Sequence, residues 1–356
     1  MSVKTTLMFL SLAISACIGL VLSHKTVGSG GGGGGAAGAN AQPVIGLSLD
    51  TLKEPRWQSD SKLFIEKANS LGAKVLVSSA DGDDTHQITD VSSMLTSGID
   101  VLVIVPHNGE AMAKAVEMAH QANVPVIAYD RLIRNCDLDL YLSFDNVKVG
   151  RLQAQWLVDH LSPPGHGRIV QVDGSPTDNN AKLFKQGADE VFKPYVDRGD
   201  IKIVWEDWAD DWKPENGKKI VNAAITQLGP NGFDAVLAAA DVVSGGVVQA
   251  LSEEGLTGKV LVTGQDADIV ACQRIIAGTQ SMTIYKPLKR LATSSAEIAV
   301  KMAHHKPIIA SQFVNNGTLD VPSILGDIYS VDKNNMMQTV IADGFHTKDQ
   351  IYGPGK

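Results

Sequence analysis

Short apolar runs recur along the chain from Val44 onward and are bounded by polar residues. Nearly continuous runs of this kind are typical of strands that are buried on both faces of a parallel sheet. The predicted strands cover residues 44–49, 74–78, 101–105, 126–129, 169–173, 201–205, 235–239, 260–263 and 282–284.

The segments between these runs space their apolar residues as amphipathic helices do. The predicted helices cover residues 59–70, 86–95, 111–122, 147–160, 180–192, 214–228, 245–254 and 267–277. Strand–helix alternation predicts doubly wound α/β units with right-handed crossovers. Two series of units meet at 140–146, where a short strand runs into a helix cap, so we predict two similar halves with a cleft between them.

Residues 1–42 differ from the rest of the chain and lead up to this pattern. The nearly apolar stretch over 7–22 follows a lysine, which is the arrangement of an export signal. Three alternatives remain for the processing of this segment. Cys17 ends a lipobox-like sequence and would be acylated, Ala39-Asn40-Ala41 fits a signal-peptidase site, and an uncleaved anchor would be short for a membrane span. In each case the folded part begins near Pro43 and lies outside the cytoplasmic membrane.

Composition narrows the class of protein. A length of 356 residues suggests two domains, and 44 % hydrophobic residues allow a sizeable core. The net charge of −8 argues against a nucleic-acid partner, which requires a basic face. The 3 cysteines form no disulfide scaffold and have no zinc-site spacing, so we expect no metal or cofactor. Cys136 and Cys272 are expected to be buried or partly buried structural thiols.

Polar and aromatic side chains follow nearly every predicted strand. The first strand lacks the glycine fingerprint that a dinucleotide site requires. Asp, Arg, Lys and Asn suit the hydroxyls of a sugar, which both donate and accept hydrogen bonds, while an indole covers a C–H face. Trp205 has the strand position and is expected in the core. The strand-end segments are 50–57, 129–131, 174–180, 208–212, 241, 264–266 and 285–287.

Each candidate also has a structural interpretation. Trp57 could be a packing residue, and Lys286 could be a solvated surface lysine. Asp130-Arg131 could form only a local ion pair, which contributes little when exposed. Asn179-Asn180 and Asp266 could cap helices, although the asparagine pair leaves room for one cap and one ligand contact.

The same segments resemble the D-xylose-binding proteins of bacterial ABC importers, a branch of the type I periplasmic binding proteins. The resemblance runs in order from about Val44 to His346. It is carried by Arg56-Trp57-Gln58, Ala128-Tyr129-Asp130-Arg131, Ser143-Phe144-Asp145-Asn146, Asp178-Asn179-Asn180-Ala181-Lys182-Leu183-Phe184, Gly264-Gln265-Asp266-Ala267-Asp268, Tyr285-Lys286-Pro287, Asn315-Asn316-Gly317 and Asp343-Gly344-Phe345-His346.

The resemblance implies a fold of two Rossmann-like lobes, each a parallel sheet flanked by helices. A three-segment hinge would join them, with crossings near Asp145, Lys286 and Val321-Pro322. The expected division is a signal and tether over 1–42, an N-terminal lobe of 43–145 plus 287–321, and a C-terminal lobe of 146–286 plus 322–356.

It further implies an extracytoplasmic monomer, periplasmic or at the cell surface, that delivers a monosaccharide to an ABC permease. The protein would close around the sugar, D-xylose by this resemblance, and perform no chemistry. The matching ligand-binding residues are Arg56, Trp57, Asp130, Arg131, Asn180, Trp212, Asp266 and Lys286, with the two tryptophans stacked on the two faces of the ring. One position departs from the family pattern, because Ala240 stands where an asparagine would contact the sugar. A related sugar is therefore an alternative ligand.

Three other functions are alternatives to transport. A sensor that presents the sugar to a chemoreceptor or sensor kinase would use the same pocket. A sugar-responsive repressor needs a helix-turn-helix before the first lobe, where this chain has an apolar run and glycines. A glycosidase would need Asp130 and Asp266 as an acid–base pair, but the neighbouring Arg131 and Lys286 would hold both carboxylates ionised.

Overall fold

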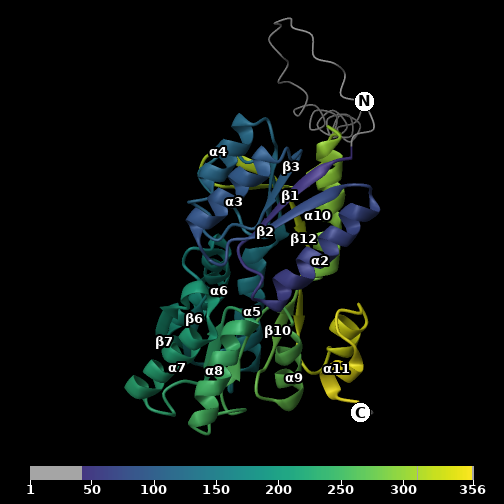
Figure 1. Cartoon of the computed structure of the whole chain (residues 1–356). Coiled ribbons are helices and arrows are strands. Elements are labelled where there is room, and N and C mark those ends of the chain that lie inside the picture. The colour runs from purple at the N-terminus through teal and green to yellow at the C-terminus, as the bar shows by residue number, and fades with distance from the viewer. Residues whose placement is uncertain (1–41, 311, 355–356) are drawn as a thin grey trace, which may run out of the picture.

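The computed structural model describes residues 42–310 and 312–354, which form two α/β lobes placed end to end (Figure 1). The predicted export signal, Cys17 and the possible cleavage site at Ala39-Asn40-Ala41 lie outside the described residues. Among those described, none of the helices combines the length and the apolar character that crossing a membrane requires.

The first lobe is built on a seven-stranded sheet in the order β11-β12-β5-β4-β3-β1-β2, in which only β11 is antiparallel to its neighbour. Its strands are β1 (Val44–Leu49), β2 (Lys74–Ser79), β3 (Val101–Ile104), β4 (Val126–Tyr129), β5 (Leu140–Phe144), β11 (Gln312–Asn315) and β12 (Asp320–Gly326). Alternate side chains of the central strands point to opposite faces, because successive residues of a strand do so.

Helices cover both faces of this sheet, so its middle strands are buried on both sides. α2 (Pro55–Ser70) and α10 (Leu288–Ala303) pack together on the face that carries Val101, Val103 and Ile127. α3 (Asp84–Thr96) and α4 (Ala113–Gln121) cover the face of Leu102 and Ile104. The continuous apolar pattern of the strands follows from this double burial.

The second lobe has a four-stranded parallel sheet and a separate antiparallel pair. The four strands are β7 (Ile201–Trp208), β6 (Gly167–Asp173), β8 (Ala235–Ala238) and β9 (Leu261–Val262), and the pair is β10 (Thr283–Tyr285) with β13 (Tyr329–Val331). The helices are α5 (Asn146–His160), α6 (Asn179–Arg198), α7 (Pro214–Leu228), α8 (Asp241–Glu253), α9 (Ile269–Ala277) and α11 (Lys348–Tyr352), with single turns η1 (Asp210–Trp212) and η2 (Met337–Ile341).

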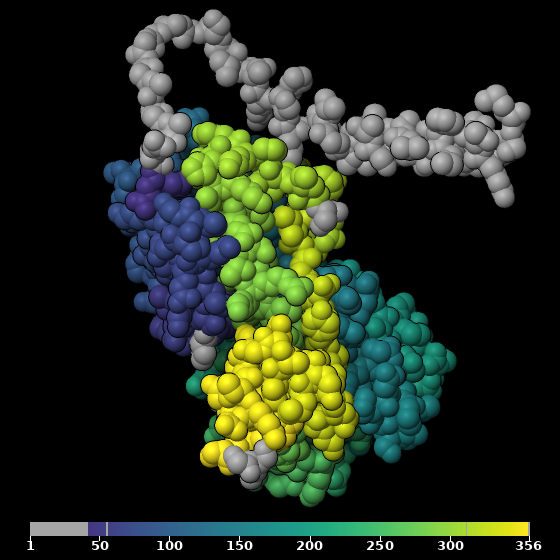
Figure 2. All heavy atoms as spheres, turned by 90° about the vertical axis from the view of Figure 1, so that its right-hand side faces the viewer, coloured from purple at the N-terminus to yellow at the C-terminus, as the bar shows by residue number. Residues whose placement is uncertain are grey.

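Close helix pairs flank this sheet, α5 with α6 on one face and α7 with α8 on the other. Glycines allow the close approach of the first pair: a Cβ added to Gly150 would lie 1.8 Å from the carbonyl oxygen of Phe184, and one added to Gly187 would lie 1.9 Å from that of Val147. The C-terminal segment lies on the second lobe beneath α10, and α11 packs on α9 (Figure 2).

The chain passes between the two sheets three times in the described part of the molecule. The first passage is at Asp145, which caps α5 by accepting a hydrogen bond from the Lys148 amide at 2.9 Å. The second is at Lys286, between β10 and α10. The third was predicted at Val321-Pro322, but β12 stays paired with β5 as far as Gly326, and the chain joins the second lobe only at β13.

Other local predictions also need correction. The cap of α6 is Asp178, which accepts from the Asn180 amide at 2.8 Å, and neither of the two asparagines caps the helix. The residue at the start of α9 is Asp268, so Asp266 is not the N-cap. Trp205 is only partly buried at the edge of the core.

The two thiols of the folded part match their prediction. Cys272 is fully buried, and Cys136 is half-buried and accessible only in part. Burial raises the pKa of the Cys136 thiol to about 12, and the neighbouring Asp137 and Asp139 add to the shift. Neither sulfur forms a disulfide in the described residues.

Candidate functional site

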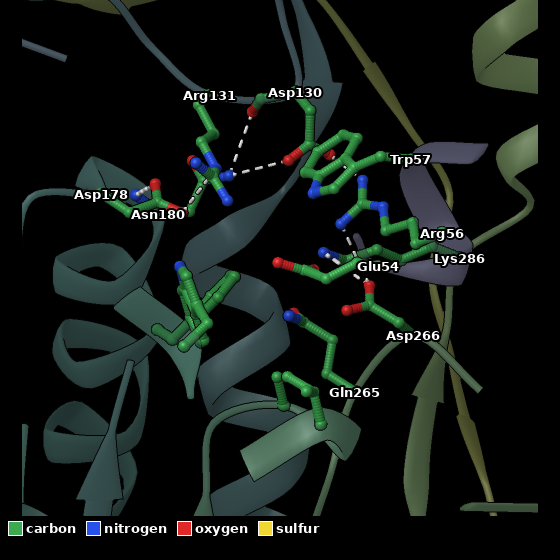
Figure 3. Close-up of a pocket in the computed structure, with 14 residues that line it drawn as sticks. Glu54, Arg56, Trp57, Asp130, Arg131, Asp178, Asn180, Gln265, Asp266 and Lys286 are labelled. Carbon is green, nitrogen blue, oxygen red and sulfur yellow. Dashed lines mark hydrogen bonds and ion pairs between the residues drawn. The ribbon is translucent and has the colours of Figure 1, made fainter. Parts of the chain in front are cut away.

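All 8 residues selected from the sequence line one pocket where the two lobes meet (Figure 3). Arg56 and Trp57 lie in the first turn of α2, which follows β1, and Asp130-Arg131 follows β4. The second lobe contributes Asn180, Trp212 and Asp266, and Lys286 comes from the second passage between the lobes. The pocket therefore lies at the carboxyl ends of the strands, where open α/β sheets bind ligands.

Arg56 is the ionic centre of the pocket. Its guanidinium donates to Asp130 of the same lobe and, through Nη1, to Asp266 Oδ1 of the other lobe at 3.2 Å. Burial opposes ionisation of Asp130, but Arg56 and Lys286 outweigh it and hold the pKa of that carboxyl below its ordinary value. The negative charge of Asp130 is therefore fixed before any ligand arrives.

Arg131 forms a second bridge between the lobes. Its Nη1 donates to Asp50 Oδ2 at 2.7 Å within the first lobe, and its Nε lies 2.9 Å from Asp178 Oδ2 of the second lobe. Burial raises the pKa of Asp178, and Arg131 opposes the rise. This bridge depends on both lobes being in contact.

Lys286 is buried, with 1 % of its surface exposed, rather than solvated. Its Nζ lies 3.4 Å from Asp266 Oδ1 and above the rings of Phe144 and Phe184, at 5.6 and 5.3 Å from their centroids. Burial lowers the pKa of Lys286, and the carboxylate of Asp266 opposes the shift. A buried amine with few hydrogen bonds has donors left for a ligand.

The two pocket tryptophans come from opposite lobes. Trp57 is buried beside two guanidinium groups, with Arg56 Cζ at 4.5 Å and Arg131 Cζ at 5.3 Å from its ring centroid. Trp212 packs against Gly174, where an added Cβ would meet the ring at 2.0 Å, so only glycine fits there. Neither indole nitrogen has a hydrogen-bond partner within the described residues.

Three pocket residues have left-handed backbone conformations. The φ angles are 65° at Asp130, 57° at Trp212 and 94° at Asp266. Such angles are uncommon for residues other than glycine, although aspartate and asparagine adopt them more readily than most. Of the three residues, Trp212 therefore has the highest conformational cost. Strained residues of this kind concentrate at functional sites, where the surrounding structure holds them in place.

Direct contacts across the cleft show that the lobes are closed on each other. Besides the two arginine bridges, Asn180 Nδ2 donates to Asp130 Oδ1 at 3.2 Å and Arg134 Nη1 donates to Asn179 Oδ1 at 3.1 Å. The same residues that line the pocket therefore hold the two lobes together.

Six further residues complete the lining of the pocket. Ala240 is the position where the sequence departs from the family pattern, and sequence reasoning did not select the other five: Glu54, Asp178, Phe184, Val242 and Gln265. Glu54, Asp178 and Gln265 belong to strand-end segments, which was the available signal. Phe184 and Val242 lie inside helices, away from the strand ends. Phe184 ends one of the segments that carry the family resemblance, and no signal marked Val242.

The arrangement favours binding over catalysis. Asp130 and Asp266, the carboxylates of the enzyme alternative, both contact Arg56. A pair held by one guanidinium offers no proton donor for general acid catalysis. Among residues 42–310 and 312–354 no group of His, Cys, Asp and Glu could hold a metal ion.

Comparisons with known proteins agree with this geometry. A family model described as periplasmic binding protein domain matches residues 45–307. The D-xylose-binding periplasmic protein of Haemophilus influenzae is 49 % identical over 308 residues, which cover 86 % of this chain and 92 % of that one. The D-xylose-binding periplasmic protein of Escherichia coli K12 is 48 % identical over 314 residues, 88 % of this chain and 94 % of that one.

Among solved structures, a carbohydrate transporter solute binding protein from Chloroflexus aurantiacus in complex with D-glucose superposes with a TM-score of 0.81. It is 31 % identical, and the match covers 87 % of this chain and 98 % of that one. The likeness extends over both lobes, so the predicted fold class is confirmed.

Proposed function

Since the chain belongs to the family of periplasmic binding proteins, which are solute receptors rather than enzymes, we propose that it captures one D-xylose molecule between its lobes and delivers it to an ABC permease. The observation that carries this proposal is the composition of the pocket. Cations, carboxylates, an asparagine and two indoles surround a single site from both lobes. The two relatives that are nearly half identical over most of the chain bind D-xylose by name.

Each of the predicted residues has a role in this proposal. Asp130 and Asp266 accept hydrogen bonds from sugar hydroxyls, and Arg56, Arg131, Asn180 and Lys286 donate to sugar oxygens. Trp57 and Trp212 cover the two faces of the ring. A sugar that touches both lobes binds the closed state more tightly than the open one, and so shifts the equilibrium toward closure.

The proposed lobes follow the strands of the two sheets. The first consists of residues 43–145 with 287–326, and the second of residues 146–286 with 327–354, so the third boundary is later than the sequence predicted. The chain acts outside the cytoplasmic membrane, and its relatives are periplasmic by name. We propose that it acts there as a monomer. Intact mass of the exported protein distinguishes a start near Gln42 from a lipid anchor on Cys17.

Isothermal titration calorimetry of the ligand-free protein tests the ligand. D-xylose is expected to bind more tightly than D-ribose, L-arabinose, D-glucose or D-galactose. No heat with any sugar, from protein with a cooperative unfolding transition, would contradict the proposal. The matched variant is Ala240→Asn, which adds an amide to the pocket wall; it should raise affinity for D-xylose, and unchanged affinity would show that Ala240 does not shift specificity.

A further inference from the structure

Glu54 lies in the pocket wall with a side chain that the fold does not use. It occupies the position before α2 in an extended conformation, yet its carboxylate makes no capping hydrogen bond. It forms no hydrogen bond or ion pair with the other described side chains, whereas the charged residues around it are paired with one another. Figure 3 shows its carboxylate pointing into the open centre of the pocket, toward the second lobe.

The position of Glu54 within the cleft is also distinctive. It lines the inner pocket and a second, outer hollow of the same cleft, together with Arg131, Trp212 and Val242. Glu54 therefore belongs to the wall between the inner pocket and the mouth of the cleft. A ring held in the inner pocket would present one edge to this carboxylate.

Glu54 is half-buried, and a carboxylate that loses water without gaining a hydrogen bond is costly. Burial raises the pKa of Glu54 to about 7, Arg131 and Arg56 oppose the rise, and Asp50 and Asp266 add to it. Donors that reach the inner pocket would remove this cost. The hydroxyl groups of a sugar are donors of the right kind.

Resting on the function proposed above, we infer that Glu54 is a further sugar-contacting residue that determines specificity. Its carboxylate accepts hydrogen bonds from hydroxyls on the edge of the ring that faces the mouth of the cleft. The preferred ligand class is thus a pyranose with free hydroxyls on that edge. A sugar that is deoxygenated or methylated there is rejected, because it would displace water from the carboxylate without donating a hydrogen bond to it.

Protonation is linked to this contact. A sugar hydroxyl donates better to the ionised carboxylate than to the acid, so binding favours ionisation and releases a proton near neutral pH. Affinity should therefore rise as the pH increases from 6 to 8 and level off above the pKa of Glu54. The pH dependence due to Glu54 must be distinguished from that of the other charged groups that face it or line the outer hollow. These groups are Asp50, Arg56, Arg131, Asp266, Lys53, Asp81, His107, Asp211 and Lys213.

His107 is the main competing source of protons. Its Nδ1 lies 2.9 Å from Asp50 Oδ1, and this contact raises the pKa of His107 above its ordinary value. The substitution Glu54→Gln leaves His107 and Asp50 in place and removes only the ionisable group at 54. Comparison of this variant with the wild type therefore isolates the contribution of Glu54.

The experiment is calorimetry of D-xylose binding at pH 7 in buffers of different ionisation enthalpy, which counts protons released. The wild type should release about 0.5 proton more than Glu54→Gln, because a group of pKa about 7 is half protonated there. Glu54→Gln should bind roughly tenfold more weakly at pH 8, about 1.4 kcal/mol, and lose the pH dependence. Glu66→Gln, an exposed site on α2, is the matched control and should behave as the wild type.

The outcomes separate this inference from the function on which it rests. Equal proton release and equal affinity in the wild type and Glu54→Gln would overturn the role of Glu54 while sugar binding stands. Absence of heat in the wild type with every sugar would overturn the proposed function itself. If Glu54→Gln fails to fold, Glu54→Asp is the deciding variant, tested against xylose, its 4-O-methyl derivative and its deoxy derivatives. Retained proton release with an altered order of affinities for these sugars supports the inference. An unaltered order of affinities refutes it.

Discussion

The two walls of the cleft are built differently. In the first lobe, Arg56 pairs with Asp130 and Arg131 pairs with Asp50, and the buried Trp57 lies beside both guanidinium groups. In the second lobe, Asp266 and Asp178 have their arginine partners in the opposite wall, at Arg56 and Arg131.

This difference suggests a division of roles. The first-lobe wall contains two ion pairs of its own, Arg56 with Asp130 and Arg131 with Asp50, so it is organised in advance to receive a sugar. The second-lobe carboxylates Asp178 and Asp266 have their arginine partners across the cleft, so this wall gains most when the lobes close. Changes in the first wall should cost both stability and affinity, and changes in the second should cost mainly affinity.

The largest effect is expected for Asp130→Asn in the first wall. Asparagine tolerates the left-handed backbone at this position, but the buried Arg56 loses its paired charge. Breaking a buried pair in this way costs about 3–5 kcal/mol of unfolding free energy, and D-xylose binding should fall below detection. Urea unfolding and calorimetry measure the two effects.

Asp197→Asn is the matched control, because Lys193 and Asp197 form a pair on the exposed surface of α6 at 2.9 Å. An exposed pair contributes about 0–1 kcal/mol, so the control should keep its urea midpoint and its affinity. A stable Asp130→Asn protein that still binds D-xylose would refute the preorganised first wall.

Substitution of the two tryptophans, one in each wall, compares the walls directly. Trp57→Ala removes a fully buried ring and should lower the unfolding free energy by about 3–5 kcal/mol. Trp212→Ala should weaken D-xylose binding by about 1 kcal/mol or more and leave the thermal midpoint of the ligand-free protein much closer to that of the wild type. Equal destabilisation by both substitutions would mean that Trp212 is a core residue and that the walls do not differ.

A smaller effect is expected on the pH dependence of the unfolding free energy, through Asp60 in the first lobe. Asp60 lies beneath Arg56 and accepts from the Tyr129 hydroxyl at 2.9 Å. Burial raises the pKa of Asp60 to about 7, and Arg56 opposes the rise. In the folded state Asp60 keeps a proton up to about pH 7, whereas in the unfolded chain it releases the proton near its ordinary pKa of about 4. The contribution of this group to the unfolding free energy is therefore fully present at low pH. It is lost as the pH rises through 7.

Asp60→Asn keeps an acceptor for Tyr129 and removes the titration. Unfolding free energy, measured in urea between pH 5 and pH 8, should decline less steeply with pH in this variant than in the wild type. Asp173 in the second lobe also has its pKa raised to about 7 by burial, so some decline should persist. Identical slopes in the two proteins would show that Asp60 is ionised throughout.

Sequence reasoning predicted most of the site because the pocket residues follow strands, and parallel strands end at one edge. The alternation of apolar runs and helical stretches placed β1 to β10 and the helices between them within a few residues. The resemblance supplied the three passages, which local pattern could not, since pairing of β12 with β5 joins segments about 180 residues apart.

The failures have local physical causes. Asp178 and Asn179 are both capping residues by type, and only the backbone geometry shows that Asp178 accepts the hydrogen bond. No strand was predicted over β12 (Asp320–Gly326), which contains Pro322, because proline is unusual inside a paired strand. Glu54 escaped notice because a glutamate in a polar segment is normally solvated, whereas this one lines the pocket.

Small-angle X-ray scattering with and without saturating D-xylose tests closure of the lobes most directly. The ligand-free protein should populate a more open state, and the sugar should reduce the radius of gyration to the value calculated from the closed structure. Asp178→Asn, which weakens the Arg131 bridge across the cleft, should enlarge the ligand-free radius and still contract with sugar. An unchanged radius on sugar binding, with binding established by calorimetry, would contradict capture by closure.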